Sequence, residues 1–139
     1  MNRIEKIEDL VIWQKARELS KKVYGLTTEG KFAKDFGLRD QIRRSSVSVM
    51  SNIAEGFERQ GDGEFKRFLS IAKGSLGEVR SQLYVALDVN YISELEFNEL
   101  NNFCIELSRK IGSFISYLES SINSIKKTRD SQTRDSRPN

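Results

Sequence analysis

Two glutamates, Glu55 and Glu78, are the residues of this 139-residue chain on which an enzyme mechanism could be built. Carboxylates on adjacent helices could hold Mg²⁺ if they faced each other, and a Mg-dependent enzyme could then process nucleic acid. The chain has no histidine, which excludes Ser-His and Cys-His mechanisms and histidine-containing metal sites. Residue spacing supplies neither a nucleophile nor a set of metal ligands. We therefore expect a non-enzymatic protein with no cofactor or metal, and the Mg-dependent enzyme is the alternative.

A polar group formed by Asn52, Glu55 and Arg59 lies on one flank of the helix that must carry Glu55. One interpretation is a functional polar site. The other is structural: Glu55 and Arg59 form an ion pair worth about 0.2–0.5 kcal/mol, and Asn52 donates an interhelical hydrogen bond that fixes the register. We favour the structural interpretation, because this group brings no catalytic partner with it.

The composition indicates a single all-α domain. The chain has one proline, is rich in Leu, Ile, Glu, Lys, Arg and Ser, and lacks segments that alternate Val or Thr with polar residues. Its one cysteine, Cys104, falls on an apolar stripe, where we expect a buried, inert thiol. We find no signal peptide and no apolar run long enough for a bilayer, so we expect a cytoplasmic protein without a membrane partner. The net charge of +3 is concentrated after residue 122.

Apolar residues recur at alternating steps of three and four in four segments, which places them on one face of each predicted helix. The helices are predicted from Glu8 or Asp9 to Leu26, from Asp35 to Arg59, from Glu64 to Val89, and from a capping box at Ser93 and Glu96 to about Ile125. Short connections favour an antiparallel up-down-up-down four-helix bundle over residues 1–125. Residues 126–139 form a polar tail that we expect to be disordered.

Small residues form a second ordered row on the predicted third helix, opposite the apolar row that runs from Phe65 to Leu87. The row consists of Ser70, Gly74, Gly77 and Ser81. Each glycine inside a helix costs about 1 kcal/mol relative to alanine, so two glycines on one face indicate that another backbone comes close. Three apolar residues also widen the buried arc of the second helix: Val47, Met50 and Ala54. We expect both sets to belong to an interface between copies of the chain.

Basic residues are a third surface feature. They recur at seven-residue intervals on the predicted third helix and occur on the two helices before it: Lys15, Lys22, Arg43, Arg44, Lys66, Lys73 and Arg80. Such residues could follow the phosphate backbone of RNA or DNA, and repetition around a ring would strengthen their field. A solvated helix face has the same pattern, so both interpretations stay open.

Four segments in chain order resemble a known family: Glu8–Ala16, Leu38–Arg44, Ser51–Gly56 and Phe68–Glu78. They are similar to the bacterial four-helix-bundle proteins encoded within intervening sequences of large-subunit ribosomal RNA genes. That family also resembles the accessory variability protein of diversity-generating retroelements. The resemblance implies a four-helix bundle and a homopentamer. Through the accessory protein it also implies nucleic acid and a reverse transcriptase as partners.

These features favour a non-enzymatic, ring-forming adaptor or scaffold. Its first expected partner is another copy of the chain, because small residues on an outer helix face suit association of helices. RNA or an RNA-processing protein is the second expected partner.

Overall fold

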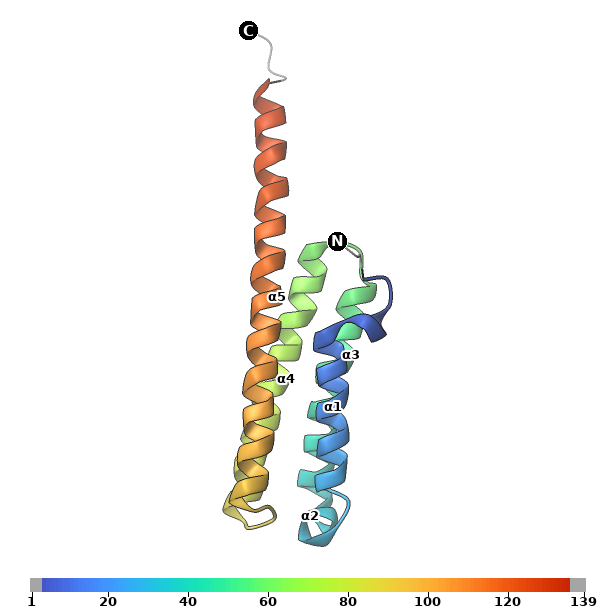
Figure 1. Cartoon of the computed structure of the whole chain (residues 1–139), viewed down its shortest axis with the longest axis vertical. Coiled ribbons are helices and arrows are strands. Elements are labelled where there is room, and N and C mark those ends of the chain that lie inside the picture. The colour runs from blue at the N-terminus through green and yellow to red at the C-terminus, as the bar shows by residue number, and fades with distance from the viewer. Residues whose placement is uncertain (1–3, 136–139) are drawn as a thin grey trace.

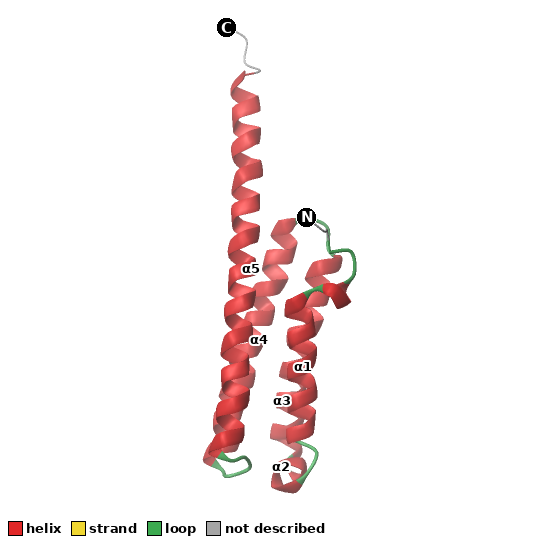
Figure 2. Ribbon diagram, viewed as in Figure 1, coloured by secondary structure: helices red, strands yellow, loops and turns green. Residues whose placement is uncertain are grey.

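The structure is a computed structural model that describes residues 4–135, with side chains up to residue 131. Every regular element in this range is helical (Figure 2). The elements are the 3-10 turn η1 (Ile7–Asp9) and the helices α1 (Val11–Leu26), α2 (Gly30–Lys34), α3 (Phe36–Glu58), α4 (Asp62–Asp88) and α5 (Glu94–Asp135). The prediction of an all-α fold is confirmed.

Four long helices form the bundle, and α2 is a short addition at one end of it (Figure 1). Helix α1 packs against α3 and α5, and α4 packs against the same two helices. Short connections return the chain antiparallel after each long helix, which gives the predicted up-down-up-down order.

The predicted apolar rows form the core. On α4, Leu69, Leu76 and Leu83 are fully buried, while Phe65 and Leu87 at the two ends of the row are half-buried. The other long helices contribute Leu19, Val23, Ile42, Val49, Ile53, Leu107 and Ile111 to the same core. Burial of one such side chain stabilises the fold by roughly 1.5–3 kcal/mol, so the rows suffice to hold the four helices together.

Two helix starts are fixed by capping side chains. The carboxylate of Asp35 accepts a hydrogen bond from the Leu38 backbone N–H at 3.1 Å, which begins α3. The predicted capping box before α5 is confirmed: Glu96 Oε1 accepts from the Ser93 N–H at 2.9 Å, and Ser93 Oγ accepts from the Glu96 N–H at 3.1 Å.

Other boundaries differ from the predicted ones. Helix α1 begins only at Val11, after η1, and α4 begins at Asp62, where Gly61 at φ 98° makes the break. The predicted loop over residues 27–34 contains α2, which buries Phe32 against Tyr91 with ring centroids 5.5 Å apart. This packing between distant parts of the chain orders a polar connection that carries no helical pattern of its own.

The segment expected to be a disordered tail is helical as far as the structure describes it. Helix α5 continues through residues 126–135, and residues 136–139 lie outside the described residues. No glycine or proline interrupts residues 126–135, so nothing in the sequence ends the helix there. The hydrogen bond between Ser121 Oγ and Asp62 Oδ2 at 2.8 Å joins α5 to the start of α4. Beyond it, α5 continues past the other helices of the bundle (Figure 1).

Gly56 permits the close approach of α3 and α4. A Cβ atom at this position would lie 2.8 Å from the Cβ of Phe68 and 3.3 Å from the backbone oxygen of Phe65. Backbone atoms cannot swing aside as a flexible side chain can, so any larger residue must push the two helices apart.

We therefore predict that Gly56→Ala lowers the free energy of unfolding by about 1–3 kcal/mol, although alanine is the better helix former. The matched control is Gly37→Ala, also on α3, where the added Cβ meets only the Asp35 carboxylate at an ordinary 3.8 Å. Urea denaturation followed by circular dichroism measures both variants. Equal stability of Gly56→Ala and the wild-type protein would contradict the close packing.

Candidate functional site

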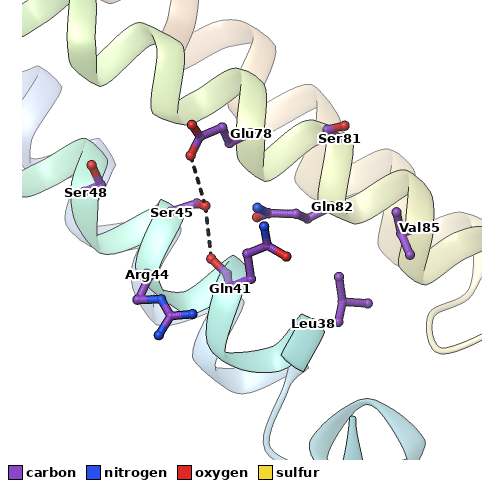
Figure 3. A pocket seen from close by; sticks show the side chains of 9 residues that line it. All are labelled: Leu38, Gln41, Arg44, Ser45, Ser48, Glu78, Ser81, Gln82 and Val85. Carbon is purple, nitrogen blue, oxygen red and sulfur yellow. Dashed lines mark hydrogen bonds between the residues drawn. The ribbon is translucent and has the colours of Figure 1, made fainter. Parts of the chain in front are cut away.

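A polar groove lies between α3 and α4 on the outer face of the bundle (Figure 3). It has a volume of about 690 Å³, and we call it the α3/α4 groove. Its lining residues are Leu38, Gln41, Arg44, Ser45 and Ser48 from α3, and Glu78, Ser81, Gln82 and Val85 from α4.

Serine side chains form the floor of this groove. The hydroxyls of Ser48 and Ser75 lie 2.9 Å apart and join α3 to α4. The Ser45 hydroxyl lies 3.0 Å from the Gln41 carbonyl oxygen and 3.4 Å from Glu78 Oε2, so it can donate to either acceptor. These serines satisfy backbone and side-chain groups without filling the space above them, which leaves the groove open.

Gln82 is the one groove residue with an unsatisfied buried atom. It is only 8% exposed, and its Oε1 has no hydrogen-bond partner among the described residues. Figure 3 shows its amide directed into the groove beside Gln41. A buried acceptor without a donor costs about 1–3 kcal/mol, so this position suits a ligand that brings a donor.

Two opposite charges stand on the two walls of the groove. Glu78 on α4 contacts the Ser45 hydroxyl, and Arg44 on α3 is exposed. Figure 3 shows the Arg44 guanidinium directed away from Glu78. Within residues 4–131, neither side chain forms an ion pair, so each is available to a charged partner outside the chain.

The side chains of the polar group predicted on α3 contact one another and their own helix. Arg59 Nη2 lies 2.9 Å from Glu55 Oε1, which is the expected ion pair. The expected interhelical bond of Asn52 is wrong: its Nδ2 donates to the Ser48 backbone oxygen at 2.8 Å and to Ser48 Oγ at 3.0 Å, inside α3. The hydrogen bond between α3 and α4 comes instead from Ser48, whose hydroxyl meets that of Ser75.

The two glutamates of the alternative enzyme site do not meet. Glu78 lies beside Ser45, whereas Glu55 lies about 15 Å further along the axis of α3 at 1.5 Å per residue. In the described part of the chain, no group of three or more Asp, Glu or Cys side chains is placed to hold a metal ion.

The seven basic residues do not gather on one surface. On α4, Lys66 Nζ pairs with Glu119 Oε1 at 3.1 Å, and Arg80 Nε donates to Asn101 Oδ1 at 2.9 Å, both across the seam with α5. Lys73 lies over the same seam, close to Gly112.

The remaining basic residues face other seams. Lys15 and Lys22 lie 5.9 and 5.6 Å from the centroid of the Phe103 ring, between α1 and α5. Arg43 donates to Thr27 Oγ1 at 2.7 Å and to the Thr27 carbonyl oxygen at 3.1 Å, which ties α3 to the end of α1. Only Arg44 lines the α3/α4 groove.

The row of small residues on α4 is exposed along its whole length, and we call Ser70, Gly74, Gly77 and Ser81 the α4 ridge. A Cβ added at Gly74 or Gly77 would meet nothing within 4 Å. Packing inside this chain therefore does not require glycine at either position.

The apolar set on α3 lies apart from the ridge, toward α1. Val47 is 37% exposed and lines a second groove of about 550 Å³, the α1/α3 groove, together with Tyr24, Asp40, Arg43, Arg44, Ser48 and Ser51. Met50 is half-buried beneath it, where its sulfur lies 3.5 Å from Ser20 Oγ, and Ala54 is also half-buried. The outer face therefore carries a ridge and a groove at different places.

Cys104 is fully buried, as predicted, and burial raises the pKa of its thiol to about 12. The thiolate is the reactive form of cysteine, so this side chain is inert at neutral pH.

Sequence patterns alone missed Gln41 and Gln82. Gln82 directly precedes the buried Leu83 and lies one turn after Glu78, so the spacing marks it as the edge of the apolar row. The burial of this edge residue depends on how closely α3 approaches α4. The spacing of residues within α4 carries no information about that distance.

Comparisons with known proteins agree with this fold. The model of the family described as "23S rRNA-intervening sequence protein" matches residues 8–113, which include every residue of the α3/α4 groove. A crystal structure of a protein with unknown function from the S23 ribosomal protein family of Bacteroides thetaiotaomicron is similar, with a TM-score of 0.68 and 25% identity. The similarity covers 75% of this chain and 97% of that chain. No curated protein matches the chain. None of the described helices is both long and apolar enough to cross a membrane.

Proposed function

Because the chain belongs to the family of 23S rRNA-intervening sequence proteins, we propose that it is a non-enzymatic helical bundle that assembles head to tail into a ring and acts as an adaptor or scaffold. The proposed ring has five copies, which is the number implied by the sequence resemblance. Its proposed second partner is RNA or another nucleic acid. A reverse transcriptase as partner stays a prediction from the resemblance.

The exposed glycines of the α4 ridge carry this proposal. Gly74 and Gly77 each cost the helix about 1 kcal/mol relative to alanine. A Cβ at either position would meet nothing within 4 Å, so no contact with another described residue offsets the cost. Close approach of a helix from a second copy would offset it, because a glycine surface lets two backbones pack closely.

The separation of ridge and groove supports a ring in particular. Association through one patch on both copies gives a closed dimer, whereas two different patches join head to tail. The ridge on α4 is exposed and built of small residues, and the α1/α3 groove is lined in part by the exposed Val47. Insertion of one copy's ridge into the next copy's groove repeats around a ring until it closes.

The distance between Glu55 and Glu78 supports a non-enzymatic role. A shared Mg²⁺ needs carboxylate oxygens about 2.0–2.1 Å from the ion, and these two side chains occupy separate stretches of the α3–α4 layer. Glu55 is also already paired with Arg59.

Our first prediction for this function concerns Gly77→Leu, which adds a branched side chain to the α4 ridge. We expect overpacking of about 1–3 kcal/mol at each contact between copies, and unchanged helicity because leucine is a good helix former. Light scattering after size exclusion should report a smaller species, while circular dichroism stays at the wild-type level. The matched control is Gly25→Leu on α1, where a Cβ also meets open space, and it should keep the wild-type mass.

A wild-type protein that is monomeric at every concentration would contradict this function. A Gly77→Leu protein with the full assembled mass would place the contact between copies elsewhere.

A second prediction tests the RNA partner. Lys73 has no ion pair among the described residues, and a ring repeats it in every copy. We expect the fluorescence anisotropy of a labelled structured RNA to rise with protein concentration, with an affinity that falls steeply as salt increases. Lys73→Glu should weaken the binding. Absence of binding at low salt would remove RNA from the proposal and leave the assembly untouched.

A further inference from the structure

We infer that Arg44 of one copy and Glu78 of the next copy form an ion pair, and that the α3/α4 groove is completed by that neighbouring copy. This inference rests on the proposed self-assembly and names the polar contact that would orient it. It concerns residues that the ridge alone does not involve.

The first observation is that both charges lack an ionic partner among the residues that the structure describes. The ion pairs of residues 4–131 include neither Arg44 nor Glu78, although both stand on one groove. The guanidinium points away from the carboxylate across that groove (Figure 3). In a head-to-tail assembly, each copy can therefore present its cation to one neighbour and its anion to the other.

The second observation is that these charges lie where the proposed contact would bring them together. Arg44 and Ser48 line both the α3/α4 groove and the α1/α3 groove. Glu78 directly follows Gly77 of the ridge and lies one turn after Gly74, so it lies beside the ridge on α4. A ridge that enters the α1/α3 groove of the next copy carries its Glu78 to that copy's Arg44.

The third observation is independent of the charges. Gln82 Oε1 is buried in the α3/α4 groove without a donor from the described residues. A group that is nine-tenths buried and unsatisfied has lost its hydrogen bonds to water and has gained none in the described chain. Such a group indicates that a contact is missing. A neighbouring copy that covers the groove can supply the missing donor.

The chemistry of the groove favours a protein surface over a polyanion. A phosphate backbone would be attracted by Arg44 and repelled by Glu78 on the facing wall. Copies of this chain carry both signs, so one neighbour can pair with Arg44 and the other neighbour with Glu78.

Reversal of the two charges tests the inference. Arg44→Glu and Glu78→Arg should each raise the dissociation constant of the assembly about tenfold or more, since each places two like charges together. The double variant restores opposite charges at every contact, so we expect a dissociation constant within about threefold of the wild-type value. Light scattering over a dilution series measures all three. Arg109→Glu is the control, since it reverses an exposed charge on α5 that forms no ion pair among the described residues, and it should leave assembly unchanged.

Loss of assembly in both single variants without recovery in the double variant would overturn the pair. If a single variant loses its helical circular dichroism signal, Arg44→Gln and Glu78→Gln replace the reversals and should each weaken assembly by a smaller factor. Unchanged assembly in all variants, together with dissociation of Gly77→Leu, would overturn the ion pair and leave the proposed function standing. A monomeric wild-type protein would overturn both.

Discussion

The hydroxyls of Ser48 and Ser75 meet at 2.9 Å in the seam between α3 and α4, and Gly56 leaves no room in that seam for one added carbon. This close approach fixes how the two helices lie against each other. Because small side chains make it, the seam holds the backbones together but leaves the surface above it unfilled. The α3/α4 groove is that unfilled surface, and its position follows from the identity of the seam residues.

The close approach of α3 and α4 also determines which groups are exposed or unsatisfied on the outer face. Small residues on α4 expose the helix backbone, and the close approach of α3 buries Gln82 without providing a donor for its Oε1. Two opposite charges beside the groove also find no ionic partner in the described chain. Each feature alone lowers the stability of the single chain slightly, and all of them lie on one face. We propose that another copy covers this face, and that the contacts between copies offset this loss of stability.

The sequence predicts most of the bundle because apolar residues at helical spacing must face a common core. Such local patterns predict the apolar rows on the four long helices, the burial of Cys104 and the capping box at Ser93. Features set by contacts between distant residues were not predictable in this way. Phe32 orders α2 only because Tyr91 lies beside it, and Gln82 is buried only because α3 approaches closely. Residues 126–135 are helical although their composition is polar, because no glycine or proline interrupts them.

The mass of the wild-type protein in solution tests the central claim, that the outer face of α3 and α4 is covered by another copy. Native mass spectrometry and sedimentation velocity can both measure it for the full 16.0 kDa chain over a range of concentrations. We predict one dominant closed assembly, with a mass of about 80 kDa if the ring holds five copies. A single species of 16.0 kDa at every concentration would contradict the account.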